Sequence, residues 1–487
     1  MNETQIKTQK FIIKYFTEIM IKGTTAKRQM ISQVFNNLLN ILSKVSKDIK
    51  VKKFFDKVEV VCPVEFADEV RTILLDTPGI QQILEAMQFD DMHTLDDIKV
   101  VVNNIMAKEI QGKSFVVRCK RVGTQEFKST NVEQTVGGYM LANNETKGVA
   151  LKGAEYTINL ELEFSQLNII THKHLGMGGF PLGTQGSILS LMSGGFDSTV
   201  ASYLAMKRGM KTHFVFFNLG GIAHEIGVKQ VAYYIWSKFG SSHRVTFTTI
   251  PFEDVVTEIF KSVSEPYMGI MLKRLMLQAS EKIADDLKID GLLTGESVAQ
   301  VSSQTLRNLA LIDQATKKLV LRPLSMMSKI DIIQIASKIG TQKFAESMPE
   351  YCGVISRNPV NHGNYERAAL EARRFDYSVL QTAIENAVSV NVDEMDENIN
   401  EIGKMEVVSD LANTNYTIID IRQSEDCIEA PCETLKIPFY KLKNEFIKLP
   451  QDKEYLLYCE KGILSQLHGQ YLRDSENCTN IKVYRPL

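Results

Sequence analysis

Short apolar runs separated by amphipathic segments recur from residue 187 to about residue 324, and this alternation constrains the fold more than any other feature. The first run is SILSLM, and the later ones include THFVFFN, RVTFTTI, GLLTG and LVLRPL. Continuous apolar strands that alternate with helices predict a doubly wound parallel sheet. Ligands of such sheets bind beyond the carboxyl ends of the strands.

The loop Ser193-Gly194-Gly195-Phe196-Asp197-Ser198 lies between the first of these runs and the next predicted helix. Backbone N–H groups and the positive end of the helix dipole make such a loop a cradle for anions. The spacing and the lysine of a Walker loop are absent. We expect the two hydroxyls to donate to phosphate, the glycines to let the backbone approach it, and Asp197 to hold Mg²⁺ or a loop N–H. The alternative is a glycine turn capped by Asp or Ser.

The two ends of the chain carry opposite charge, although 56 Lys and Arg nearly balance 58 Asp and Glu overall. Residues 1–57 hold twelve basic residues against four acidic ones, and residues 391–410 hold seven acidic residues against one lysine. A basic segment suits a polyanion such as RNA, although a solvated, lysine-rich helix face would look the same. The acidic stretch is typical of a linker or an exposed helix between folded units.

The first 165 residues mix strand and helix patterns without a nucleotide-binding loop, which predicts small α+β modules. Residues 156–164 alternate apolar and polar side chains, as a half-buried strand does. Residues 113–121 predict a second strand that ends in Lys120 and Arg121. The glycine-rich residues 174–186 indicate a loop or a boundary. We interpret His172 and His174 as facing solvent, because further metal ligands cannot be located.

The last 77 residues, 411–487, alternate between strand and helix patterns again and predict a small α/β domain. Cys459 ends the strand EYLLYC and opens a loop before a helix. Helix-terminal N–H groups lower the pKa of a thiol in this position, so the thiolate can accept sulfur. A cysteine phosphatase would need arginine six residues later, where this chain has Ser465. Five other thiols are interpreted as non-catalytic, since their spacing fits no common zinc site: Cys62, Cys119, Cys427, Cys432 and Cys478.

S-G-G-x-D-S resembles the pyrophosphate-binding loop of N-type ATP pyrophosphatases, which cut ATP between the α and β phosphates and leave an adenylated substrate. The segments FNLGGIAHEIG, MLKRLM, LLTGES, QVSSQTLRNL, LRPL and MPEYCGVIS make the chain similar to the tRNA 4-thiouridine synthases, or tRNA sulfurtransferases. The resemblance covers nearly the whole chain. It implies a ferredoxin-like domain in residues 1–59, a THUMP RNA-binding domain in 60–165, a PP-loop domain in 174–390, an acidic linker in 391–410 and a rhodanese-like domain in 411–487.

The resemblance also assigns residues to the binding of ATP. Lys273 is also expected on chemical grounds, because the phosphates of ATP need a cation and the loop itself contains none. Lys329 is matched by a family lysine, and its alternative is a solvated lysine at a helix start. Lys120 and Arg121 are expected to contact RNA. The expected ATP contacts are Leu191, Met192, Ser193, Gly194, Gly195, Asp197, Ser198, Lys273, Gly295 and Gln304.

For the sulfur chemistry, the resemblance implies that Cys459 carries a persulfide and that Cys352 resolves it. Asp420 and Arg422 look like the supporting D-x-R element of rhodanese folds, and their alternative is a plain surface ion pair. Relatives tend to have arginines where this chain has Lys461 and Gln466. Stabilisation of the persulfide would then rest on backbone amides and the one lysine.

Together these features predict an ATP-dependent enzyme that converts a uridine of tRNA to 4-thiouridine. ATP would adenylate the C4 oxygen, and sulfur would arrive as the bound persulfide of Cys459 or as sulfide released by Cys352. We expect Mg²⁺ with ATP, no permanently bound cofactor or metal, and a cysteine desulfurase as donor. We also expect a thiamine sulfur-carrier protein as a further acceptor, a homodimer, and a cytoplasmic location without a membrane segment.

Three rival functions belong to other classes. A small-molecule adenylating ligase has no need of the basic segment or the rhodanese-like tail. A sulfur-relay protein for thiamine thiazole synthesis would use mainly the carboxyl-terminal domain. A pure RNA-binding adaptor would have no use for S-G-G-x-D-S.

Overall fold

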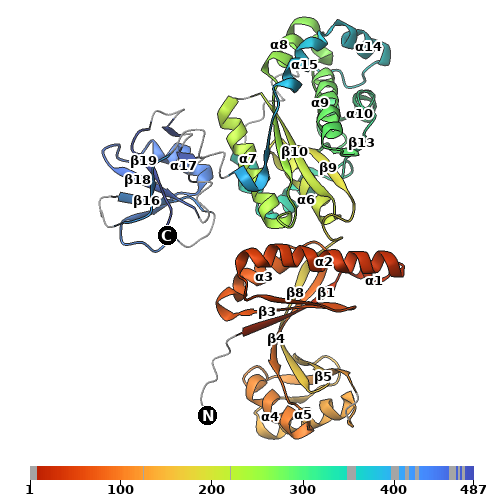
Figure 1. Cartoon of the computed structure of the whole chain (residues 1–487), viewed down its shortest axis with the longest axis vertical. Helices are drawn as coiled ribbons and strands as arrows, with labels where there is room; N and C mark the ends of the chain where they lie inside the picture. The colour runs from red at the N-terminus through yellow and green to blue at the C-terminus, as the bar shows by residue number, and fades with distance from the viewer. Residues whose placement is uncertain are drawn as a thin grey trace. The chain divides into compact units, whose positions relative to one another are not determined.

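The computed structural model describes residues 8–123, 126–219, 221–347, 358–395, 405–411, 416–422, 427–459 and 478–486, with a few residues between 465 and 473. The chain divides into two compact units (Figure 1). One contains residues 1–184 with 207–209, and the other contains the rest. Among the described residues no helix is long and apolar enough to span a membrane.

The first unit is built on one eight-stranded sheet of order β2-β3-β1-β4-β8-β7-β5-β6. Its strands are β1 (Thr8–Tyr15), β2 (Lys50–Lys53), β3 (Lys57–Pro63), β4 (Ile80–Phe89), β5 (Ser114–Val122), β6 (Gly148–Val149), β7 (Tyr156–Glu163) and β8 (Gln166–Gly178). Its helices are α1 (Thr17–Met20), α2 (Thr24–Val45), α3 (Ala67–Leu75), α4 (Leu95–Met106) and α5 (Ser129–Asn143), with a 3₁₀ turn at Val64–Phe66.

Two hydrophobic cores lie against this sheet (Figure 1). The first packs α2 and α3 onto β1, β3 and β4, and it includes Val34 and Leu38 of α2 and extends to Ile83 of β4. The second packs α4 and α5 onto β5, β7 and β8. Helix α4 begins with a capping box between Thr94 and Asp97, which satisfies N–H groups at its amino end.

Two of the expected boundaries do not match the sheet. The break after residue 59 falls inside β3. Residues 57–63 of this strand pair antiparallel with residues 8–14 of β1. The break after residue 165 precedes β8, which pairs antiparallel with both β4 and β7. Residues 174–178, expected in a loop, continue β8. The hydrogen bonds of β8 therefore join the two α+β modules into one sheet.

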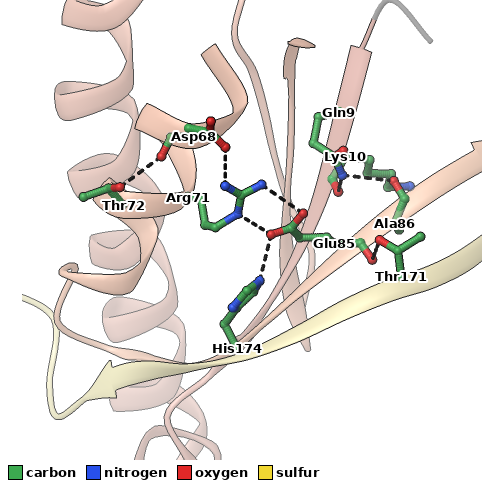
Figure 2. Close-up of polar contacts among 9 residues, drawn as sticks. All are labelled: Gln9, Lys10, Asp68, Arg71, Thr72, Glu85, Ala86, Thr171 and His174. Carbon is green, nitrogen blue, oxygen red and sulfur yellow. Dashed lines mark hydrogen bonds and ion pairs between the residues drawn. The ribbon is translucent and has the colours of Figure 1, made fainter. Parts of the chain in front are cut away.

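Glu85 lies on β4 beneath α3, where side chains from α3 and β8 bind its carboxylate (Figure 2). Arg71 of α3 donates from Nε to one carboxylate oxygen and from Nη2 to the other, and His174 Nε2 lies 2.7 Å from Oε1. Burial alone would raise the pKa of Glu85, but the bonds from Arg71 and His174 hold it below its usual range. The expectation that His174 faces solvent is wrong, because this carboxylate binds its ring, whereas His172 is exposed.

Buried ion pairs tie β3 and β1 to β7. Lys10 and Lys57, each 3% exposed, both contact the buried Glu59, at 3.0 and 2.8 Å. Lys57 also pairs with Glu163 of β7. A buried charge without a partner would be strongly destabilising, so these contacts favour the observed arrangement of the two modules.

The second unit contains a six-stranded sheet of order β13-β12-β9-β10-β11-β14. The strands are β9 (Ser187–Leu191), β10 (Lys211–Asn218), β11 (Thr246–Pro251), β12 (Gly291–Leu293), β13 (Leu319–Leu321) and β14 (Val388–Asn391). The pairs are parallel except that β14 runs antiparallel to β11. The predicted doubly wound parallel sheet is confirmed.

Helices follow the strands of this sheet, as the alternation predicts (Figure 1). They are α6 (Phe196–Lys207), α7 (Gly221–Phe239), α8 (Glu253–Ser262), α9 (Met268–Asp286), α10 (Leu306–Asp313), α11 (Lys329–Ile339), α12 (Gln342–Ser347), α14 (Tyr365–Arg374) and α15 (Tyr377–Glu385), with 3₁₀ turns at Glu265–Tyr267, Ser302–Gln304 and Val392–Glu394. After β9 the chain adds β10 and β11 on one side, and later β12 and β13 on the other. The sheet therefore has a topological switch point between β9 and β12, where such folds bind ligands.

A five-stranded parallel sheet of order β15-β19-β18-β16-β17 forms the carboxyl-terminal part. Its strands are β15 (Val407–Val408), β16 (Tyr416–Asp420), β17 (Thr434–Lys436), β18 (Glu454–Tyr458) and β19 (Ile481–Tyr484), and α17 spans Phe439–Phe446. The predicted alternation and the predicted strand EYLLYC are confirmed, since EYLLY forms β18 and YTIID and IKVY form β16 and β19. Most of the segment after Cys459, ILSQLHGQYL, lies outside the described residues.

Candidate functional site

The S-G-G-F-D-S loop lies at the switch point, after the end of β9, and its last three residues form the first turn of α6. Leu191 pairs with Val215 of β10, and the buried Met192 donates its N–H to the Val215 carbonyl at 2.8 Å. Gly194 has a φ of 79°, a left-handed conformation that favours glycine. These two features lead the chain out of the strand and directly into the loop.

Ser198 closes the loop from within. Its Oγ accepts the Ser193 N–H at 3.1 Å and lies 3.0 Å from Ser193 Oγ. Ser198 is 5% exposed, whereas Ser193 is exposed. Of the two hydroxyls expected to face phosphate, Ser193 is thus the one at the surface, and Ser198 fixes the loop's shape.

Asp197 receives two donors from outside the loop. Lys329 Nζ, from the first turn of α11, lies 2.7 Å from Oδ1, and Gln300 Nε2 donates to Oδ2 at 2.9 Å. Lys329 therefore contacts the loop, although it lies 132 residues away in the chain. Gln300 was not predicted as a site residue.

Gly295 brings the end of β12 against the same loop. A β-carbon at this position would lie 2.5 Å from the Asp197 carbonyl carbon and 2.6 Å from the Ser198 nitrogen. Contacts below 3.0 Å essentially never occur, so only glycine fits without movement. The geometry therefore places Gly295 directly beside the predicted phosphate cradle.

The next residue, Glu296, joins two cations beside this turn. Its Oε1 accepts from Lys273 Nζ of α9 at 2.7 Å, and its Oε2 accepts from Arg322 Nε at 2.7 Å and from the Thr294 hydroxyl at 3.1 Å. Burial alone would raise the pKa of Glu296, but Lys273 and Arg322 lower it to about 2. Lys273 was predicted from sequence, whereas Glu296 and Arg322 were not.

Two further side chains belong to the surroundings of the loop. Gln304 is 8% exposed and its backbone carbonyl accepts the Ala299 N–H at 3.0 Å, which shapes the turn that presents Gln300. His224 of α7 hydrogen-bonds to the backbone of Ser193, and burial lowers its pKa. His224 lies within the segment FNLGGIAHEIG, but nothing in that segment shows which element its ring would contact.

Cys459 follows β18 and is 5% exposed. Its Sγ accepts the Ser465 backbone N–H at 3.3 Å and lies 3.4 Å from Ser465 Oγ. Ser465 is helical, so the sulfur receives a helix-terminal N–H as the sequence predicts. Lys461, Gln466 and Cys352 lie outside the described residues.

Asp420, at the end of the neighbouring strand β16, is fully buried. Its carboxylate accepts from the Arg422 guanidinium at 2.7 Å and from the Ile428 N–H at 2.9 Å. Burial alone would raise the pKa of Asp420, but the bonds from Arg422 keep it below its usual range. Arg422 also lies over the ring of Tyr458, next to Cys459. The pair is therefore not the plain surface ion pair considered as an alternative.

A basic groove of about 430 Å³ lies on the first unit. Lys120 lines it, but the next residue, Arg121, points to the other face of β5 because side chains alternate along a strand. Arg118, which the sequence analysis missed, shares the face of Lys120. The groove holds more cations than carboxylates: Lys14, Arg118, Lys120 and Lys173 against Glu133 and Glu161.

Comparison with known families accounts for most of this architecture. Residues 10–83 match the ThiI ferredoxin-like domain, residues 92–171 match the THUMP domain, and residues 183–376 match the family described as Thiamine biosynthesis protein (ThiI). The fold and the switch-point loop define a multidomain PP-loop protein with ferredoxin-like and THUMP modules.

Individual relatives identify one family within this class of multidomain PP-loop proteins. The chain is 42% identical to the tRNA sulfurtransferase of Saccharophagus degradans over 98% of this chain and 100% of that protein. It is 44% identical to that of Tolumonas auensis over 98% and 99%. The chain belongs to the tRNA sulfurtransferase family. A crystal structure of a 4-thiouridine synthetase–RNA complex with bound ATP shares the fold, with a TM-score of 0.70 and 23% identity over 79% of this chain and 100% of that one.

Proposed function

We propose that this enzyme adenylates C4–O of a tRNA uridine with ATP and then replaces the adenylate with persulfide sulfur, giving 4-thiouridine. The observation that supports this most is the S-G-G-F-D-S loop at the switch point, with Asp197 bound to Lys329 and with Gly295 packed against it. Oxide is a very poor leaving group, so the carbonyl oxygen must be activated first. Transfer of AMP releases pyrophosphate and makes AMP the leaving group.

The residues of the loop divide this work. Exposed N–H groups of the loop and the Ser193 hydroxyl bind phosphate, and Lys273 and Lys329 neutralise charge that develops on pyrophosphate. Mg²⁺ fits this site through one carboxylate, Asp197, together with ATP phosphates. The ion would neutralise phosphate charge. Asp197 already accepts two hydrogen bonds, and a carboxylate has about four lone-pair positions.

Sulfur delivery belongs to the carboxyl-terminal, rhodanese-like domain. A cysteine desulfurase transfers sulfane sulfur to Cys459, whose sulfur is held by the Ser465 N–H. In the direct route the terminal sulfur attacks C4 and AMP leaves, and the Cys352 thiolate then attacks Cys459 Sγ, which breaks the S–S bond and releases 4-thiouridine. In the other route Cys352 attacks Cys459 Sγ first, and the sulfide released displaces AMP from C4. Both routes end in a Cys352–Cys459 disulfide, which a cellular dithiol must reduce before the next turnover.

The first unit binds the tRNA. Its groove combines cations that can contact phosphates, which position RNA without reading its sequence. We further propose transfer of sulfur to the carrier protein of thiamine thiazole synthesis, which the description of the matched family favours. We also propose that the enzyme is a homodimer whose subunits share one tRNA.

The direct test is mass spectrometry of tRNA nucleosides from cells that lack this protein, complemented with wild type or with Asp197→Ala. We expect 4-thiouridine to disappear and to return only with wild type. Purified Asp197→Ala should still bind tRNA but lose ATP–pyrophosphate exchange, because phosphate positioning and RNA binding lie in different units. Exchange that persists in this variant would refute the assignment of the loop.

A further inference from the structure

Glu296 is a buried carboxylate beside the switch-point loop, and three described side chains donate hydrogen bonds to it. It is 8% exposed, and its described donors are Lys273, Arg322 and Thr294. Lys273 lies 23 residues before it and Arg322 lies 26 residues after it. The carboxylate therefore connects α9, the end of β12 and the segment after β13 at one point.

The cluster contains two cations, Lys273 and Arg322, and two carboxylates, Glu296 and Asp313. The cations hold the pKa of Glu296 at about 2, so it is ionised at neutral pH. Arg322 turns its other nitrogens to Asp313, whose side chain is 46% exposed. Arg322 is thus bound by two carboxylates, whereas the ion pair described for Lys273 is with Glu296 alone and its side chain is 24% exposed. The ammonium of Lys273 can therefore also contact an anion.

The position of Glu296 relative to the loop is fixed by its neighbour. Gly295 packs against the Asp197–Ser198 peptide with no room for a β-carbon. This contact places the backbone of Glu296 beside the loop, and the bonds from Lys273, Arg322 and Thr294 hold its carboxylate. A lysine side chain has four flexible bonds, and holding it in place before the ligand arrives removes much of the entropic penalty of binding.

We propose that Glu296 is a positioning residue, which holds the Lys273 ammonium beside the loop so that it meets the phosphates of ATP without rearrangement. The inference rests on the proposed function, in which Lys273 contacts ATP. An ammonium has three N–H donors. One goes to Glu296, and two remain for phosphate oxygens.

The test compares the KM for ATP of Glu296→Gln with that of wild type in tRNA-dependent ATP–pyrophosphate exchange. Glutamine keeps the shape but presents a donor where one cation now binds, so Lys273 or Arg322 must turn away. We expect the KM for ATP to rise about tenfold or more, with tRNA affinity unchanged. Asp313→Asn is the matched control, because it removes an acid from the outer side of Arg322, and its KM should stay within about twofold of wild type.

A purely structural role would give a different result. Partial unfolding lowers the number of active molecules and so lowers kcat, but it leaves the KM for ATP unchanged. An unchanged KM in Glu296→Gln, or an equal rise in Asp313→Asn, overturns the proposal. If Glu296→Gln does not fold, Glu296→Asp keeps the charge and withdraws it by one methylene, and a smaller rise in KM is expected; an unchanged KM there overturns the proposal as well.

A double-mutant cycle separates this inference from the function on which it rests. If Glu296 acts through Lys273, Glu296→Gln should add nothing to the KM of Lys273→Met. Additive effects would show that Glu296 acts by another route. A rise in Lys273→Met with none in Glu296→Gln overturns only this inference. No rise in Lys273→Met overturns the assignment of Lys273 to ATP together with the inference.

Discussion

Replacement of Gly295 by alanine should disable the ATP site while the sheet stays folded. The new β-carbon would lie 2.5 Å from the Asp197 carbonyl carbon, and ordinary van der Waals contact begins at 3.4 Å. The loop or the turn must therefore move by about 0.9 Å, the difference between these distances. The neighbours are backbone atoms, so no side chain can rotate away. A displacement of about 1 Å in a catalytic site lowers turnover about 10²-fold.

The assay is ATP–pyrophosphate exchange in the presence of tRNA, with thermal unfolding measured in parallel. Overpacking of this size should also destabilise the protein by about 1–3 kcal/mol. Gly291→Ala is the matched control, because Gly291 lies on β12, the strand that leads to Gly295, and its β-carbon would meet its nearest neighbour, the Leu319 carbonyl oxygen, at 3.4 Å. Exchange at the wild-type rate in Gly295→Ala, or an equal loss in Gly291→Ala, would refute the steric argument.

Three further predictions concern other parts of the molecule. Cys459→Ala should keep ATP–pyrophosphate exchange and lose thiolation, because activation and sulfur delivery are separate steps; normal thiolation would exclude Cys459 as the sulfur carrier. Burial raises the pKa of Cys62 to about 11 and that of Cys119 to about 12. Native protein at pH 8 should therefore leave both unlabelled by iodoacetamide in peptide mapping, and fast labelling would contradict their burial. Burial, with Lys211 nearby, lowers the pKa of His213 from 6.5 to about 4. Between pH 6.5 and about 4 the unfolded chain therefore binds more protons than the folded one. The free energy of unfolding falls as the pH drops through this window, by at most about 3 kcal/mol. His213→Gln should flatten the dependence of Tm on pH there, and an unchanged slope would count against it.

The sequence predicts the parallel sheet and its loop because both depend on local patterns. Short apolar runs such as SILSLM are typical of interior strands, and S-G-G-F-D-S needs only its own glycines and the following helix. Lys329 could be proposed from a family match alone. Its contact with Asp197 could not be predicted from local spacing, because it joins residues 132 positions apart.

The errors have the same physical origin. The predicted boundary after residue 59 falls inside a strand because β3 is positioned by its pairing with β1, which lies far away in the sequence. His174 was interpreted as solvent-facing because Glu85, 89 residues earlier, gives no local signal. Arg121 is a different case, since the alternation of side chains along β5 already separates it from Lys120 and joins Arg118 to the same face.

The shared sheet of the first unit sets a limit on how such enzymes can be recombined. Strand β8 hydrogen-bonds to β4 and to β7, and Lys57 of one module pairs with Glu163 of the other. A chimera that exchanges only the THUMP segment would place a foreign strand beside β8 and could remove Glu163, one of the two carboxylates that pair with the buried Lys57. The smallest part to transplant with the proposed tRNA-binding groove is therefore the whole of residues 8–178.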